Sequence, residues 1–184
     1  MLRSERRPLT IRDYRQLPEG PPYYQLIEGD LYMAPPPDRL HQDILGNLHF
    51  ILRSHLERRP LGSVHLAPSD VQLTDLNVYQ PDLYYVTRAR KEILTAQGAR
   101  GAPDLVVEIL SPKTAKLDNG VKREIYARAG VEEMWVVDPT LRKIYVYRFA
   151  EAIATPVGTY GIKQKFESHL FPGLKIELAR VFEP

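Results

Sequence analysis

Two acidic residues stand on neighbouring strand-like segments, where their carboxylates could carry out chemistry together. Asp82 opens the segment Pro81–Val86, and Glu108 lies inside the segment Pro103–Leu110. Apart from its acids, the second segment is apolar on both faces, which is typical of a strand covered on both sides. Burying an unpaired carboxylate costs several kcal/mol or more. Glu108 must therefore be paired, hydrogen-bonded, protonated or bound to a metal ion.

Two such acids with a nearby lysine could form a magnesium site. Mg²⁺ prefers hard oxygen ligands and keeps several waters, so Asp82, Glu108 and a backbone carbonyl such as that of Ile109 would suffice to hold it. The remaining positions would take water and a phosphate oxygen. A lysine would then orient the attacking water and offset charge in the transition state. Lys122 is the lysine we favour, because it lies with Tyr126 on one flank of a predicted helix.

Each of these residues also has a simpler structural explanation. Asp82 could be a strand-start acid that backbone amides or a neighbouring arginine satisfy. For Asp104 we retain the same explanation, because it follows a proline at a strand entry, where an acid can also stay solvated and cap a turn. Lys122 could be an ordinary solvated helix lysine paired with Asp118.

The other candidates for chemistry are weaker. His41, His49 and His55 share one predicted helix, but no two are three or four residues apart, so they do not form a helical metal pair. His41 opens that helix and either faces the cleft or has a helix-terminal or packing role. Tyr126 is expected to pack. The chain has no glycine-rich phosphate loop, Gly-x-Ser-x-Gly elbow or His-Glu-x-x-His helix, which argues against those enzyme classes.

The elements that position these residues follow from the spacing of apolar residues. Leu40 to Leu56 recur at three- and four-residue steps behind a capping Asp38 and predict a helix to about Arg59. A second helix is expected from Ala115 or Asp118 to Ala129, with Gly130 at its end. The other expected elements are a short helix at 11–17, a hairpin turning at 28–30, and strands near 64–67, 70–73, 134–137, 144–149 and 160–166.

Composition favours one domain spanning residues 1–184, because 184 residues at 43% hydrophobic content suit a single core. The absence of cysteine excludes a disulfide framework and thiolate chemistry and fits a cytoplasmic protein. No apolar run reaches the roughly 18 residues of a membrane span, so no membrane partner is expected. A net charge of +2 permits binding to a polyanion without requiring it. Seventeen arginines and 16 prolines favour a heat-tolerant source, although genomic base composition gives the same arginine bias.

Several short segments carry a family resemblance, and Gly101–Pro112 is the most specific of them. The others are Tyr24–Gly29, Ala34–Pro35, His41, Pro81–Asp82, Lys122, Tyr126, Gly130–Val131, Trp135–Pro139 and Pro172–Leu174. In this order, over nearly the whole chain, they closely resemble the Uma family, a large bacterial group of restriction-endonuclease-like proteins.

The resemblance implies the PD-(D/E)xK nuclease fold, an α/β (α+β) domain in which helices flank a mixed β-sheet. Asp82 matches the motif aspartate and Glu108 the motif glutamate. The superfamily usually has lysine two positions after the glutamate, where this chain has Leu110. In the Uma family the lysine has moved to the following helix, where Lys122 matches. Lys113 and Lys116 are nearer in sequence and stay open as alternatives.

The implied activity is hydrolysis of phosphodiester bonds in nucleic acid, with DNA favoured, Mg²⁺ as the cofactor and Mn²⁺ as a substitute. Asp82, Glu108 and Lys122 would be catalytic, and Asp82, Glu108 and Ile109 would hold the metal. A homodimer or higher homo-oligomer is expected, because cutting both strands of a duplex needs two sites. Two other classes stay open: an inactive nuclease-fold module that binds nucleic acid or assembles, and a carboxylate-pair hydrolase such as a glycosidase, which would leave Lys122 idle.

Overall fold

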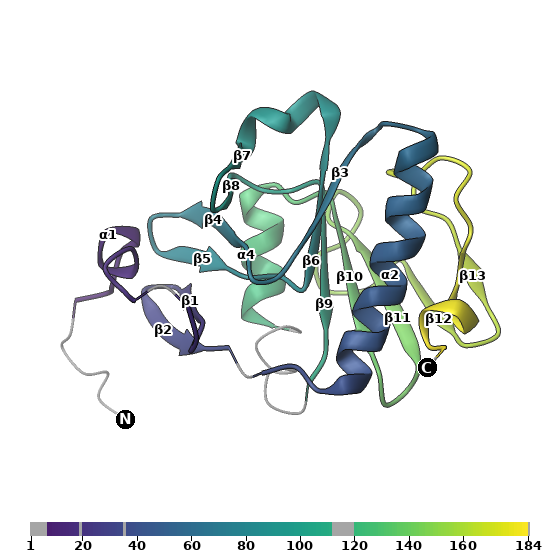
Figure 1. The fold of residues 1–184 in the computed structure, drawn as a ribbon, viewed down its shortest axis with the longest axis horizontal. Coiled ribbons are helices and arrows are strands. Elements are labelled where there is room, and N and C mark those ends of the chain that lie inside the picture. The colour runs from purple at the N-terminus through teal and green to yellow at the C-terminus, as the bar shows by residue number, and fades with distance from the viewer. Residues whose placement is uncertain (1–6, 19, 35, 112–119, 184) are drawn as a thin grey trace.

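The computed structural model describes residues 7–18, 20–34, 36–111 and 120–183. Within these ranges the strands form two six-stranded sheets and a two-stranded pair, with helices packed against them (Figure 1). The predicted mixed sheet with flanking helices is confirmed. A second sheet, which no pattern in the sequence indicated, gathers the N-terminal hairpin and several short strands.

The central sheet carries both acid-bearing segments in adjacent strands. Its order is β12-β11-β10-β9-β6-β3, and only β9 and β10 are parallel among these neighbours. Parallel strands need a crossover connection, and α4 provides it here. The bounds are β3 (Gly62–Leu66), β6 (Leu83–Thr87), β9 (Leu105–Ile109), β10 (Glu133–Asp138), β11 (Lys143–Arg148), β12 (Gly158–Gly161) and α4 (Val121–Ala129).

The two longest described helices lie on opposite faces of this sheet (Figure 1). Leu48 of α2 (Arg39–Arg58) packs in one apolar cluster with Val107 and Ile109 of β9. Val106 of the same strand faces the opposite way, into a cluster with Tyr126 of α4. Burial on both faces explains why β9 is apolar at nearly every position. By the same alternation Glu108 lies on the α4 face.

Helix α2 begins and ends close to the predicted positions, and α4 ends at the predicted residue. The Asp38 side chain caps α2 by accepting the His41 N–H at 2.8 Å, and Gly130 ends α4 with φ of +96°, a left-handed value that favours glycine. Residues 112–119 lie outside the described ranges, so the part of the predicted second helix before Val121 stays a prediction. Among the described helices, none is long and apolar enough to cross a membrane.

The second sheet has the order β2-β1-β5-β4-β8-β7 and includes the predicted hairpin of β1 and β2. Its strands are β1 (Tyr24–Ile27), β2 (Asp30–Met33), β4 (Asp70–Thr74), β5 (Asn77–Tyr79), β7 (Leu94–Thr95) and β8 (Gly98–Arg100). The remaining elements are α1 (Ile11–Tyr14), the 3₁₀ helix η1 (Arg88–Ile93), β13 (Lys165–Phe166), β14 (Ile176–Glu177) and α5 (Leu178–Val181). Helix α1 is shorter than predicted, and the strand expected at 160–166 is divided by a turn.

Candidate active site

Glu108 is buried on β9 and receives two hydrogen bonds from α4. Its Oε1 accepts the Tyr126 hydroxyl at 2.7 Å and the Lys122 ammonium at 3.3 Å. Lys122 and Tyr126 are four residues apart, so they lie on the same face of the helix. The Lys122 side chain is only 3% exposed and that of Glu108 only 4%. Lys122 is therefore a buried, paired lysine, and the alternative of a solvated helix lysine is wrong.

Two tyrosines lie beside this ion pair. The Lys122 Nζ lies 5.9 Å from the centre of the Tyr79 ring, within the range of a cation–π contact. The rings of Tyr79 and Tyr126 make a T-shaped contact, with their planes perpendicular and their centres 5.2 Å apart. Burial raises the pKa of Tyr79 far above its ordinary value, and the charges of Glu28 and Glu108 raise it further. Tyr79 therefore stays protonated and offers no second base beside Glu108.

Asp82 lies at the start of β6, between the end of β9 and the first turn of α2. Its Oδ2 accepts the Ile109 N–H at 2.7 Å, and its Oδ1 lies 3.1 Å from His41 Nε2. In the antiparallel β6/β9 ladder Leu83 pairs with Val107, so the next facing positions are Asp82 and Glu108. The two acids therefore stand at the same end of adjacent strands. Whether their carboxylates share one ion stays a prediction.

The donor set here fits a hard cation. Asp82 and Glu108 offer carboxylate oxygens, and the Ile109 N–H already points at Asp82. The N–H and carbonyl of one strand residue point the same way, so the Ile109 carbonyl also faces the β6 side. Within the described residues, no group of three or more histidine or acidic side chains is placed to hold a metal ion. An ion held by two carboxylates and a carbonyl would complete its shell with water and substrate oxygen, as Mg²⁺ commonly does.

Asp104, which follows a proline as Asp82 does, has a structural role at the far end of β9. Its Oδ2 accepts the Thr87 N–H at 2.7 Å, and its Oδ1 pairs with Arg90 at 3.0 Å. The expected satisfaction by a backbone amide or a nearby arginine is confirmed. The expectation that Asp104 stays solvated is wrong, because the end of β6 and Arg90 of η1 leave it only 4% exposed.

The structure adds contacts that the sequence analysis missed. Tyr126 was expected only to pack, yet its hydroxyl reaches Glu108, and its four-residue spacing from Lys122 was the signal for this. His41 faces Asp82, so the first turn of α2 contributes to the site. No sequence pattern indicated Tyr79. Lys113, Lys116 and Asp118 lie outside the described residues, so their roles stay predictions.

The mixed sheet, with α2 before it and α4 after the glutamate strand, is a restriction-endonuclease-like fold. The chain matches the model of the Uma2 family, described as "Putative restriction endonuclease", over residues 11–179, and it belongs to this family. The predicted resemblance is therefore confirmed. The fold is similar to the crystal structure of a "putative nuclease belonging to DUF820" from Anabaena variabilis ATCC 29413. The two are 21% identical with a TM-score of 0.78, covering 95% of this chain and 98% of that chain. Comparison with curated proteins gives no match.

Proposed function

We propose that this protein is a metal-dependent nuclease that hydrolyses phosphodiester bonds in nucleic acid, with DNA as the favoured substrate. The observation that carries the proposal is the buried ion pair of Lys122 and Glu108, whose charged atoms are 3.3 Å apart. Burying two charges is costly, and well-packed apolar residues often stabilise a fold equally well. An ion pair of this kind beside a second acid, in a family of restriction-endonuclease type, supports a catalytic role.

In this proposal Asp82, Glu108 and the Ile109 carbonyl hold Mg²⁺, and Mn²⁺ can replace it. The bound ion would activate water and neutralise charge on the phosphate. The Lys122 ammonium, held in place by Glu108, supplies positive charge where negative charge develops on the scissile phosphate. Tyr126 orients the Glu108 carboxylate through its hydroxyl, and His41 orients Asp82. Both are positioning residues.

We also infer a two-fold homodimer, because closed dimers are the commonest assembly and a duplex has two strands to cut. The chain has a mass of 21.1 kDa. Sedimentation at micromolar concentration should therefore show a species of twice this mass. A single 21.1 kDa species would contradict the dimer without affecting the proposed chemistry.

A second candidate function is a nuclease-fold module that binds nucleic acid without cutting it. The observation in its favour is that Glu108 Oε1 already accepts two hydrogen bonds from α4. A buried carboxylate satisfied in this way can serve the fold alone. Such a module would bind nucleic acid equally well with and without a divalent ion.

An assay panel separates the two functions. Single-stranded, duplex and branched DNA and the matched RNAs are incubated with the protein in Mg²⁺, Mn²⁺ or a chelator. A nuclease should cut at least one substrate with an ion, stop cutting in the chelator, and lose cutting in the variant Lys122→Met. Binding without cutting in every condition would overturn the proposal and favour the module.

A further inference from the structure

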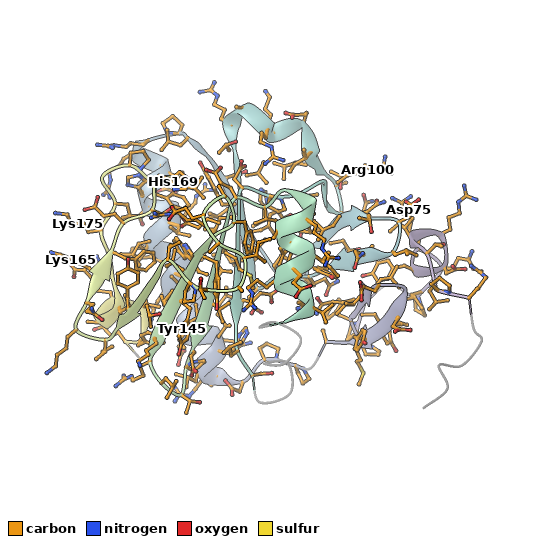
Figure 2. All side chains as sticks on the ribbon, turned by 180° about the vertical axis from the view of Figure 1, so that it is seen from behind. Asp75, Arg100, Tyr145, Lys165, His169 and Lys175 are labelled. Atoms are coloured by element: carbon orange, nitrogen blue, oxygen red, sulfur yellow. The ribbon has the colours of Figure 1, made fainter. Side chains whose placement is uncertain are left out.

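A pocket of about 180 Å³ lies beside the candidate active site on the α4 face of the central sheet. Its walls come from Leu110, Arg123, Asp138, Tyr145 and Tyr147. Figure 2 views this face, with α4 in front of the sheet and Tyr145 labelled on β11. At about 30 Å³ for each water in the liquid, the pocket has the volume of about six waters.

The sheet register sets the distance between this pocket and Glu108. Val136 of β10 pairs with Glu108 on one side and with Tyr145 of β11 on the other. Residues in register across a sheet point to the same face, so Tyr145 and Glu108 share the α4 face. Neighbouring strands are about 4.8 Å apart, which separates the two backbones by about 10 Å. The pocket therefore borders the candidate catalytic residues on the same face of the sheet.

Arg123 links the pocket to the site, because it follows Lys122 in the first turn of α4. Its guanidinium carbon lies 5.1 Å from the centre of the Tyr147 ring. Its Nη1 donates a hydrogen bond to the Tyr147 hydroxyl at 3.4 Å. A guanidinium has five N–H donors, so others remain for an acceptor on a bound molecule.

The other walls indicate what kind of molecule this is. Asp138 offers carboxylate oxygens, and its Oδ1 is held in place by the Leu141 N–H at 2.8 Å. Burial, together with the charge of Asp138, raises the pKa of Tyr145, so its hydroxyl keeps its proton. Leu110 adds an apolar surface. The negative charge of Asp138 disfavours a phosphate group here, whereas a nucleobase has flat faces for the aromatic rings and an edge with both donors and acceptors.

We propose that this pocket holds one unstacked nucleobase of the substrate, next to the scissile phosphate. The inference rests on the proposed function, which makes nucleic acid the substrate. Arg123 and Asp138 contact the edge of the base, and Tyr145 contacts one of its faces. The protein then prefers nucleic acid that is single-stranded or locally opened, because a base in a duplex must first leave its stack.

Photocrosslinking in a chelator tests the pocket without any cutting. Single-stranded oligonucleotides with 5-iodouracil at one position are irradiated with the wild-type protein, and the crosslinked peptide is identified by mass spectrometry. Crosslinks are expected at Tyr145 or Tyr147. Arg123→Gln and Tyr145→Leu should each weaken oligonucleotide binding at least about fivefold, the lower end of what a stacked base contributes. Arg128→Gln removes the same charge from an exposed position on the same helix and should have no effect.

Abasic substitution separates a base from a phosphate as the occupant. Removing the base at one position of the oligonucleotide should weaken its binding to the wild-type protein. The same change should not alter its binding to the Tyr145→Leu variant. Equal binding of all abasic oligonucleotides would overturn the proposal and leave phosphate contacts as the explanation. Thermal melts show that each variant is folded.

The outcomes also separate this inference from the proposed function. Cutting by the wild type with crosslinks only outside the pocket would overturn the base pocket and leave the nuclease proposal standing. Crosslinks at Tyr145 or Tyr147 with no cutting in any ion would support the pocket and overturn the nuclease. The absence of both crosslinking and binding would overturn the pocket, whatever the cutting assay shows.

Discussion

Lys122 of α4 reaches Glu108 of β9 across the face of the central sheet, with its Nζ 3.3 Å from the carboxylate and both side chains almost fully buried. The lysine thus approaches from the helix that connects β9 to β10, and not from β9 itself. The position two residues after Glu108 is Leu110, which lines the neighbouring pocket. The lysine on α4 therefore stands beside the glutamate, and the residue just after β9 can stay apolar.

The variant Lys122→Met tests the catalytic role of the lysine. It keeps the length of the side chain and removes its charge, so cutting should fall about 10²- to 10³-fold, the usual cost of losing one preorganised electrostatic group. Calorimetric titration should still detect Mn²⁺ binding. Normal cutting by this variant would transfer the role to Lys113 or Lys116.

Asp82→Asn and Glu108→Gln test the metal ligands. Each replaces a carboxylate with a neutral amide of the same shape, so Mn²⁺ affinity should fall by more than about tenfold, and cutting should fall with it. The measurement is calorimetric titration of Mn²⁺ into folded protein. Unchanged affinity in both variants would remove these two acids from the metal site.

Asp104→Asn is the matched control among the acids that follow a proline. Its carboxylate accepts the Thr87 N–H and pairs with Arg90, so the substitution should lower the free energy of unfolding by about 1.5–3 kcal/mol. Mn²⁺ affinity should not change. Urea unfolding and calorimetry on the same sample check both statements. If Asp104→Asn loses Mn²⁺ binding and keeps its stability, Asp104 would be the metal ligand and Asp82 the structural acid.

The sequence predicted the secondary structure of the central sheet well, because periodicity and capping are local properties. The cap at Asp38, the apolar stripe of α2 and the glycine at position 130 are local signals. Each depends on residues no more than one or two helical turns apart. Glu108 was recognisable because a carboxylate inside an apolar strand requires a partner. The helix flank and the family resemblance both indicated Lys122, but its ion pair with Glu108 was not predicted, since spacing alone does not tell which side chains meet across the sheet.

The features that were missed depend on contacts between distant segments. Asp104 is buried because Arg90 folds back over it, and no local pattern near Asp104 shows this. Strands β3 and β4 are close in sequence but belong to different sheets. Tyr79 reaches the site only because the second sheet packs against α4. Each of these outcomes is decided by tertiary packing, which overrides local preference.

Tyr126→Phe tests how much the hydrogen bond from the tyrosine hydroxyl to Glu108 contributes to the stability of the fold. The substitution removes a hydrogen bond to a buried charged group, so it should cost about 1.5–3 kcal/mol of stability. Tyr85→Phe is the control, because the buried Tyr85 hydroxyl has no hydrogen-bond partner among the described residues. Urea unfolding should show the control to be neutral or stabilising. Equal losses in both variants would show that packing, and not the bond to Glu108, explains the effect.

His55 should make the fold less stable in mild acid. The residue is buried on α2 with its ring edge toward Phe171, and burial lowers its pKa, with Arg59 and Arg58 adding to the effect. The folded pKa lies below the unfolded value of about 6.5, so the unfolded chain binds more protons as the pH falls. The stabilisation is therefore complete above about pH 6.5 and is lost as the pH falls through the folded pKa. Burial also lowers the pKa of His65, which contributes with the same sign.

The variant His55→Leu isolates this contribution. Urea unfolding at pH 7.5 and pH 5.5 should show a smaller loss of stability in the variant than in the wild type, with His65 contributing to the slope that remains. An unchanged slope in His55→Leu would mean that His55 binds protons equally in the folded and unfolded states, which its burial beside two arginines argues against.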